Sequence, residues 1–476
     1  MANRSGPQTD ESDLPNIILV MSDDQGWGDV GYNGNPVVKT PHLNAMAEEC
    51  LRLDRFYAAA PVCSPTRGSC LTGRHPFRYN IPYAGQGHLP HEEITLATAL
   101  KTAGYATGHF GKWHVGQLSK TLKQSEFPVP ADPTYYAPPW VHGFDECCST
   151  ESMMPTYNPY YHDCGPIGTE GYRFIMDKPV ARGDRSGVRW QGSYWTGPGQ
   201  IVDHNIPGDD STFIMDRALD FLDRKFADHQ PVFSCIWFHT PHTPIVAGND
   251  MRELYSELSL PEQHWYGCLT AMDLQVGRLR KYLRDKGVAE NTILWFCSDN
   301  GPSFVHDLNS AGPFRGKKAT LWEGGVRVPG IVEWPAELKG GRVLGAPICT
   351  SDFYPTLLNA AGVEMERQPP LDGIDAMPIL TGATDRRESA IGFDSPIKEP
   401  DSNNQSTDRL QATWTTDDYK LSTFDDGQTW QLYDMNKDPE EQNDVAADHP
   451  ALVEEMKEAL TEWRRSCARS AEGEDY

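Results

Sequence analysis

Short runs of consecutive apolar residues alternate along the chain with longer segments whose apolar side chains recur every three or four positions. The runs cover residues 16–21, 231–238 and 292–297, and unbroken runs of this length are typical of parallel strands buried on both faces. The amphipathic segments, which predict helices, lie at about 40–51, 95–103, 211–226 and 261–286. We therefore predict an α/β domain over residues 14–380, with a large, mixed, mostly parallel sheet sandwiched by helices.

The pattern changes after about residue 380. Segments 410–414, 419–422 and 430–434 alternate between apolar and polar residues, which predicts antiparallel strands, and an amphipathic helix is expected at about 450–465. Residues 381–476 are therefore predicted to form a smaller α+β subdomain built on a short antiparallel sheet.

Between about residues 117 and 205 neither periodicity holds, and the segment is rich in Pro, Gly and aromatic residues. A long irregular insert inside a compact domain is usually a lid or a rim around a site. Its larger side chains either line a polar substrate cleft or pack the loops against one another; they are Tyr157, Tyr160, Tyr161, His162, Arg173, Trp190 and Trp195.

Charge and cysteine content narrow the class of protein. The 476 residues include 42 Lys and Arg against 67 Asp and Glu, a formal net charge of −25, which argues against nucleic-acid binding. No run of apolar residues is long enough to cross a membrane. The eleven cysteines lack zinc-site spacing, and Cys147, Cys148 and Cys164 either pair within their loop or remain buried thiols. The polar residues 1–6 carry no signal peptide, so either the protein is not exported or this is a mature form with a new start.

Polar residues follow each predicted core strand. Asp23 and Asp24 come after the first run, Lys112 and His114 follow a short strand, His242 follows the second run, and Asp299 and Asn300 follow the third. Parallel strands place these ends on one edge of the sheet, and the two-residue spacing predicts that the side chains of Lys112 and His114 point the same way. Carboxylates with an amide oxygen suit Ca²⁺ or Mg²⁺, so we expect a shared cation rather than separate solvated turns.

The sequence Cys63-Ser64-Pro65-Thr66-Arg67 places a thiol where a loop enters a helix. Backbone N–H groups at the helix start and a cation one turn away are expected to lower the pKa of the thiol. Taken alone, this short motif fits a half-buried structural cysteine better than a reactive one.

Several further motifs occur with it in a fixed order. They are Asn16 to Gly28, Leu71-Thr72-Gly73-Arg74, Gly111-Lys112-Trp113-His114-Val115-Gly116, His142-Gly143-Phe144-Asp145, Pro241-His242-Thr243-Pro244, Ser298-Asp299-Asn300-Gly301, Lys318 with Glu323-Gly324-Gly325, and Leu432-Tyr433-Asp434 before Asp438-Pro439. On these residues the chain resembles the Cys-type, formylglycine-dependent type I sulfatases of the alkaline phosphatase superfamily.

The resemblance implies that a maturase oxidises Cys63 to formylglycine, whose hydrated aldehyde attacks the sulfur atom of a sulfate ester. It also implies roles for the strand-end residues. Asp23, Asp24, Asp299, Asn300 and the modified Cys63 would hold the cation, Ca²⁺ or Mg²⁺; Arg67 would stabilise the formylglycine; Lys112 and Lys318 would bind sulfate oxygens; His114 would accept a proton; and His242 would contact the substrate and protonate the leaving alcohol. His239 is a rival to His242, and Lys317 to Lys318; the motif context favours His242 and Lys318.

The expected function is hydrolysis of a sulfate monoester on a carbohydrate or sulfated polysaccharide. The carbohydrate preference comes from the breadth of the family and from the polar, aromatic segment 117–205. One alternative is a formylglycine-dependent phosphonate monoester or phosphodiester hydrolase, and another is a non-catalytic protein that binds sulfated glycans. The expected partners are the sulfated substrate and, transiently, the maturase, with no nucleic acid or membrane. The resemblance implies a periplasmic or extracellular location.

Overall fold

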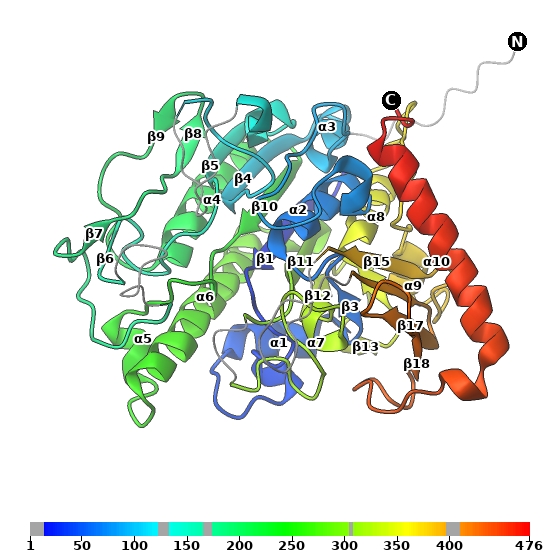
Figure 1. Cartoon of the computed structure of the whole chain (residues 1–476). Helices are drawn as coiled ribbons and strands as arrows, with labels where there is room; N and C mark the ends of the chain where they lie inside the picture. Colours follow the sequence, from blue (N-terminus) through cyan, green and yellow to red (C-terminus); the bar gives the residue numbers. More distant parts are fainter. Residues whose placement is uncertain (1–13, 122–132, 165–173, 304–307, 397–409) are drawn as a thin grey trace, which may run out of the picture.

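A central sheet runs through the molecule, and its middle strands are the three apolar runs. The computed structural model describes residues 14–121, 133–164, 174–303, 308–396 and 410–476 (Figure 1). Strand β1 (Asn16–Ser22) lies between β10 (Val232–Trp237) and β11 (Thr292–Ser298), and β4 (Ala106–Lys112) lies beside β10; all of these neighbours are parallel. The large, mixed, mostly parallel sheet predicted from the sequence is confirmed.

Shorter strands extend the sheet on both sides. The order among the described residues is β13 (Arg342–Leu344), β2 (Leu51–Leu53), β12 (Gly330–Glu333), β11, β1, β10, β4, β5 (Glu146–Thr150), β8 (Trp195–Gly197) and β9 (Gln200–Ile201). Strands β12, β8 and β9 pair antiparallel with their neighbours. A separate parallel pair joins β3 (Phe56–Tyr57) to β14 (Ile348–Cys349). The central part of the sheet, which carries the polar strand ends, is therefore parallel throughout.

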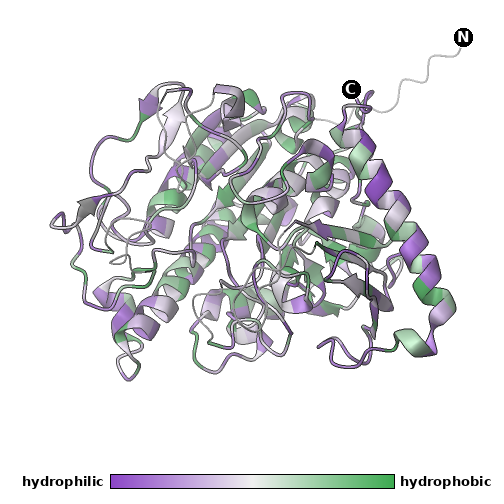
Figure 2. Ribbon diagram, viewed as in Figure 1, coloured by the Kyte–Doolittle hydropathy of each residue, from purple (hydrophilic) through white to green (hydrophobic). Residues whose placement is uncertain are grey.

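Helices cover both faces of the sheet because side chains alternate along each strand. Ile18 and Val20 of β1 belong to one core with α1 (Pro41–Glu49), α4 (Asp210–Ala227) and α6 (Leu260–Asp285). Leu19 and Met21 belong to the opposite core with α2 (Cys63–Thr72), α3 (Leu96–Lys101) and α8 (Phe353–Ala360). Figure 2 shows hydrophobic residues along the central strands and hydrophilic ones on the outer helix faces. The short helices α5 (Asn249–Glu253) and α9 (Met377–Thr381) also belong to this part of the chain.

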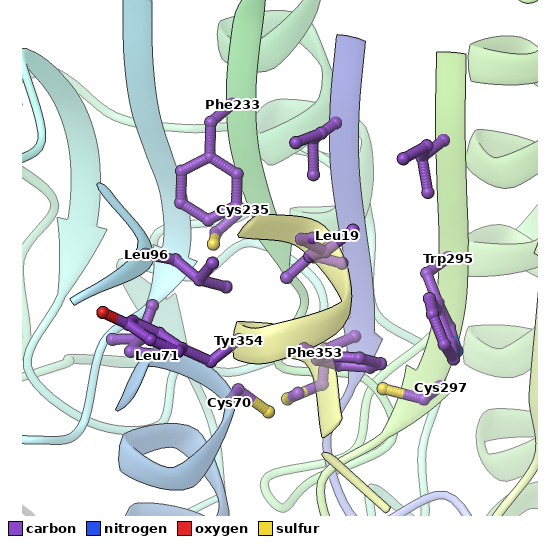
Figure 3. Close-up of a cluster of buried hydrophobic side chains, with 14 of the residues drawn as sticks. Leu19, Cys70, Leu71, Leu96, Phe233, Cys235, Trp295, Cys297, Phe353 and Tyr354 are labelled. Atoms are coloured by element: carbon purple, nitrogen blue, oxygen red, sulfur yellow. The ribbon is translucent and has the colours of Figure 1, made fainter. Parts of the chain in front are cut away.

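Helix α2 is buried on all sides, which fixes the residue at its start. All ten of its residues are buried, and Cys70 and Leu71 belong to the core that also contains Leu19 of β1 and Tyr354 of α8 (Figure 3). The helix ends at Gly73, whose φ of 71° lies in the left-handed region. Cys63 is its first residue and is 1% exposed, so its position is set by core packing.

The C-terminal residues form the predicted small antiparallel sheet. Its order is β15 (Ile391–Ser395), β16 (Gln411–Thr415), β17 (Tyr419–Thr423) and β18 (Gln431–Asp434), and α10 (Pro450–Ala471) lies along it (Figure 1). A buried ion cluster joins this sheet to the main domain: Lys420 Nζ lies 3.0 Å from Glu323 Oε1 and 2.9 Å from Glu441 Oε1. Glu323 begins α7 (Glu323–Val326), so the small sheet holds the start of a helix in the large domain.

The segment predicted to be irregular, about residues 117–205, contains three strands of the main sheet, β5, β8 and β9. Strand β5 pairs parallel with β4, and the sequence conceals it because Glu146, Ser149 and Thr150 interrupt its apolar character. Short strands β6 (Tyr161–His162) and β7 (Val188–Arg189) also form there. Tyr160, Trp190 and Trp195 are only 1%, 5% and 2% exposed, so they pack the interior rather than line an open cleft. Arg173 lies outside the described residues.

For the cysteines, the structure favours the second of the two alternatives, buried thiols. None of the eleven cysteines, all of which lie in the described ranges, forms a disulfide, and each is buried. Within those same ranges, no helix has both the length and the apolar character needed to cross a membrane.

Candidate active site

Three carboxylates meet where the two central strands end. The β1–β11 register pairs Ser22 with Ser298, so Asp23 and Asp299, the next residue on each strand, are neighbours. Asp24 adopts a left-handed φ of 64°, and its backbone N–H donates to Asp299 Oδ1 at 3.1 Å. The predicted convergence of the acidic strand ends on one edge of the sheet is present in the structure.

Cationic side chains lie against each of these acids. Lys112 Nζ is 2.6 Å from Asp23 Oδ2, and Lys318 Nζ is 2.6 Å from Asp24 Oδ1. Arg67 donates to Asp299 Oδ2 through Nη2 at 2.7 Å and through Nε at 3.1 Å, and its Nη1 donates to the Lys112 carbonyl at 3.0 Å. Within this group the three positive charges balance the three negative ones, as burial away from water requires.

The positions of these charges set the direction of several pKa shifts. Burial raises the pKa of Asp299 to about 6. The negative charge of Asp23 contributes to this rise, and the positive charge of Arg67 opposes it. Burial opposes ionisation of Asp24 too, but the charges of Lys318, His242 and Lys112 hold its pKa below the ordinary value.

The expected lowering of the Cys63 pKa is wrong for this structure. Burial raises the pKa of the thiol, and the cations Lys112 and Lys318 oppose that rise only in part because the acids Asp23 and Asp299 reinforce it. The sequence argument considered the helix start and Arg67, but it did not count the cost of burial or the nearby carboxylates. The geometry around position 63 therefore does not favour a thiolate.

The donor atoms at this site fit a divalent cation. One ligand atom each from Asp23, Cys63 and Asp299 lies within 4.8 Å of the others. Asp23 Oδ1 and Asn300 Oδ1 are buried and accept no hydrogen bond from a described residue, while Asn300 Nδ2 donates to Asp24 Oδ1 at 2.8 Å. Buried oxygen atoms without a donor are what a hard cation would satisfy.

The structure separates the two candidate histidines. The Nε2 atom of His242 lies 3.7 Å from Asp24 Oδ2, and Nδ1 donates to the Thr243 carbonyl at 2.7 Å, which turns the Nε2 side toward the acids. His239 instead uses Nδ1 on Asp210 Oδ2 and Nε2 on Thr150 Oγ1, each at 2.7 Å. His239 is 0% exposed, so it is held inside the fold while His242 borders the site.

His114 and Lys318 also lie at the site, although the strand alternation expected for Lys112 and His114 does not hold. Strand β4 ends at Lys112 and His114 has a φ of 58°, so strand alternation does not set their relative direction. His114 Nε2 lies 3.4 Å from Ser152 Oγ, and burial with the charges of Lys112 and Arg67 holds the pKa of His114 well below its ordinary value. Lys317 is exposed, whereas the Lys318 side chain is only 12% exposed.

The sequence analysis gave no role to two features that support the site. Ser152, the partner of His114, follows a strand that was not predicted. Gly301 packs against the start of α7: a Cβ there would lie 2.0 Å from the Gly324 carbonyl oxygen, and its N–H donates to the Gly325 carbonyl at 2.9 Å. The loop that carries Asp299 and Asn300 is therefore pressed against Gly324 and Gly325.

The chain is similar to known proteins along most of its length. A family model described as sulfatase matches residues 15–363, and one described as N-sulphoglucosamine sulphohydrolase, C-terminal, matches residues 315–466. Among curated relatives, steryl-sulfatase of Mus musculus is 32% identical over 444 residues (80% of this chain, 67% of that protein), and N-acetylgalactosamine-6-sulfatase of Sus scrofa is 32% identical over 391 residues (77% and 66%). The chain thus spans about two thirds of the length of these relatives.

Solved structures share the fold. The crystal structure of Ps i-CgsB in complex with k-i-k-neocarrahexaose aligns with a TM-score of 0.77, covering 95% of this chain and 93% of that one at 24% identity. The fold and the site together place the protein in the class of sulfuric ester hydrolases. The chain belongs to the sulfatase family, as its motifs indicated.

We predict that Gly301→Ala disables the site without removing a charged group. The new Cβ would collide with the Gly324 backbone and displace the neighbouring Asp299 and Asn300. We expect kcat/KM for an aryl sulfate to fall about a hundredfold, because small displacements of positioned groups cost that much. The matched control is Gly345→Ala, where nothing lies within 4 Å of the added Cβ. Equal activities for the two variants would contradict the role given to this contact.

Proposed function

We propose that this protein hydrolyses a sulfate monoester on a carbohydrate, using a formylglycine made from Cys63 and a divalent cation, most suitably Ca²⁺. The observation that carries the proposal is the arrangement of Asp23, Asp24 and Asp299 with Arg67, Lys112 and Lys318 around Cys63 at the start of α2. Membership of the sulfatase family supports the reaction class.

Charge balance explains how so acidic a protein attracts an anionic ester. The three acids and three cations of the site cancel, so a divalent ion would leave the site with a net positive charge against the global −25. Asp23, Asp24, Asp299 and Asn300, with the side chain at position 63, would hold that ion. When bound, the ion would act as a Lewis acid. It would polarise the sulfate, and it would make a hydroxyl group bound to the ion easier to deprotonate.

The chain's own residues then bind the sulfate and move the protons. Lys112 and Lys318 neutralise the sulfate oxygens, and Arg67 holds both Asp299 and the end of β4 in place. His242 donates a proton from Nε2 to the leaving alcohol, since its Nδ1 is engaged by the Thr243 carbonyl. His114, which burial favours in its neutral form, accepts a proton from the hydroxyl at position 63.

The fold limits the time at which Cys63 can be modified. Formylglycine supplies a geminal diol, which an unmodified thiol lacks. Because Cys63 is 1% exposed and the helix behind it is buried, a maturase would need to reach the thiol before the chain folds. This protein is therefore proposed to meet its maturase as an unfolded chain.

Location outside the cytoplasm, periplasmic or extracellular, is proposed on the family resemblance. The absence of disulfides among the eleven cysteines adds no support for it, since exported proteins form disulfides readily.

The decisive test of the nucleophile is Cys63→Ala after co-expression with a maturase. Intact-mass analysis of the parent protein should show the mass loss expected for conversion of a cysteine to the aldehyde, and Cys63→Ala should abolish turnover of an aryl sulfate while the circular dichroism spectrum stays the same. Activity of Cys63→Ala near the parent level would refute the assignment. A strong preference for a phosphodiester over the aryl sulfate would favour the phosphonate or phosphodiester hydrolase, and absence of turnover by the fully converted protein would favour a glycan-binding role.

His242→Ala should reduce turnover most for those substrates whose leaving group needs a proton. A sugar alcohol leaves poorly without one, so kcat for a sugar sulfate should fall by about 10²–10⁴-fold, whereas a nitrophenyl sulfate, whose phenolate leaves unaided, should lose only a few-fold. His239→Gln is the comparison at the rival position, and any loss there should be the same for both substrates. Equal losses with both substrates for His242→Ala would remove its role as the acid.

A further inference from the structure

A chain of hydrogen bonds between buried side chains runs behind the site. It joins Tyr194, Asp210, His239 and Thr150, each of which is at most 1% exposed. The Tyr194 hydroxyl donates to Asp210 Oδ1, and Asp210 Oδ2 lies 2.7 Å from His239 Nδ1. On the other side of the ring, His239 Nε2 lies 2.7 Å from Thr150 Oγ1. The chain therefore ties together the long insert, the start of α4, the loop after β10 and the end of β5.

The hydrogens of this chain can be followed from one group to the next. Burial and the charge of Asp210 raise the pKa of Tyr194 well above its ordinary value, so the phenol remains a donor. The single hydrogen of the Thr150 hydroxyl goes to the Ser152 carbonyl at 2.8 Å, which leaves the hydroxyl oxygen to accept from His239 Nε2. The imidazole of His239 therefore orients the Thr150 hydroxyl toward Ser152.

Thr150 connects this chain to the segment that presents His114. It pairs with Lys112 in the register of β4 and β5, and its carbonyl accepts the Trp113 N–H at 3.0 Å. Its hydroxyl closes a short turn onto the Ser152 carbonyl, and the Ser152 hydroxyl lies 3.4 Å from His114 Nε2. The side chain of Thr150 thus holds Ser152 where it meets the ring of His114.

The orientation of the His114 ring depends on its contact with Ser152. The other ring nitrogen, Nδ1, is buried and has no hydrogen-bond partner among the described residues. The backbone of His114 has a φ of 58°, so the residue is not held in a strand at this point. A base must lie within hydrogen-bond reach of the proton that it accepts, and small displacements of such a group are costly. Whatever holds Ser152 in place therefore also holds the base.

His239 meets the other side of the site through its backbone alone. Its carbonyl accepts the His242 N–H at 2.7 Å, a bond that any side chain at position 239 would retain. The ring of His239 is 0% exposed and has both nitrogens bonded inside the fold, so it does not reach the substrate. A change in the ring should therefore affect His114 and leave His242 in place.

We infer that His239 is a positioning residue for the reaction: through Thr150 and Ser152 it holds the ring of His114 where it accepts the proton of the hydroxyl at position 63. The inference rests on the proposed sulfatase reaction and adds to it a role for a histidine that does not meet the substrate. The two histidines of one turn then serve opposite sides of the reaction, His239 by supporting the base and His242 as the acid.

Thr150→Val tests this link without breaking the pair of Asp210 and His239. An apolar residue in place of His239 would leave Asp210 buried without a partner, which can unfold a protein, whereas valine keeps the shape of threonine. In the NMR spectrum of the unconverted protein, the ring signals of His114, assigned from their loss in His114→Gln, should shift in Thr150→Val. They should keep the parent position in Thr150→Ser, which retains the hydroxyl.

Steady-state kinetics of the matured enzyme provide a second measurement. In Thr150→Val, kcat for para-nitrophenyl sulfate should fall about tenfold or more, because the base is displaced. KM should not rise, since Lys112 and Lys318 still hold the sulfate, and the loss for a sugar sulfate should be no larger, since every substrate shares the hydroxyl at position 63. Thr150→Ser should restore kcat to within a few-fold of the parent value.

Thr107→Val is the matched control, because it makes the same change near the other end of β4. The buried Thr107 hydroxyl donates to the Gly143 carbonyl at 2.7 Å and accepts from the Asp145 N–H at 2.9 Å, so its loss should lower the melting temperature without moving the His114 signals.

Three results would overturn the inference and leave sulfatase activity intact. They are unmoved His114 signals in Thr150→Val, a rise in KM with an unchanged kcat, and a larger loss for a sugar sulfate than for para-nitrophenyl sulfate, which would place the effect on His242. Absence of turnover by the fully converted parent would instead reject the proposed function, while the His114 signals would still decide whether Thr150 orients that ring.

Discussion

The structure depends on a set of opposite charges buried together at the ends of the central strands. Asp23, Asp24 and Asp299 would repel one another strongly in an interior of low dielectric constant if they stood alone. Arg67, Lys112 and Lys318 offset that repulsion at distances of 2.6–2.7 Å. Such a cluster contributes little net stability, because desolvation offsets the attraction, but it fixes which side chains face one another.

Much of the surrounding fold serves to hold these charges in register. Parallel pairing of β1 with β11 places Asp23 beside Asp299, and the buried α2 presents Cys63 and Arg67 to them. The small C-terminal sheet contributes as well: Gln411 Nε2 donates to the Ala319 carbonyl at 3.1 Å, and Lys420 pairs with Glu323. These two contacts support the segment that carries Lys318 and the turn that packs on Gly301. The small sheet therefore supports the site from a distance.

The sequence predicted those parts of the fold that leave a strong local pattern. The apolar runs that became β1, β10 and β11 identified the buried strands, and the polar residues directly after them identified the edge where Asp23 and Asp299 meet. Strand β5 was missed because Glu146 and Ser149 break its apolar character, although pairing with β4 buries it. Short strands such as β2 and β12 depend on partners far along the chain, which periodicity does not reveal.

Properties that arise from burial were the least accessible from sequence. The raised pKa of Cys63 comes from surroundings that several distant segments supply. Motif context selected His242 and Lys318 over His239 and Lys317, and the structure shows a physical difference: His239 has both ring nitrogens occupied inside the fold, and Lys317 lies exposed.

Calorimetric titration of Ca²⁺ into chelator-treated, matured protein tests the central claim most directly. The account predicts saturable binding of one ion per chain, with a rise in melting temperature as the ion stabilises the folded state. Binding should be at least tenfold weaker in Asp299→Asn and unchanged in Asp203→Asn, whose side chain is 90% exposed. No binding by the parent protein, or equal affinity in Asp299→Asn, would contradict the account.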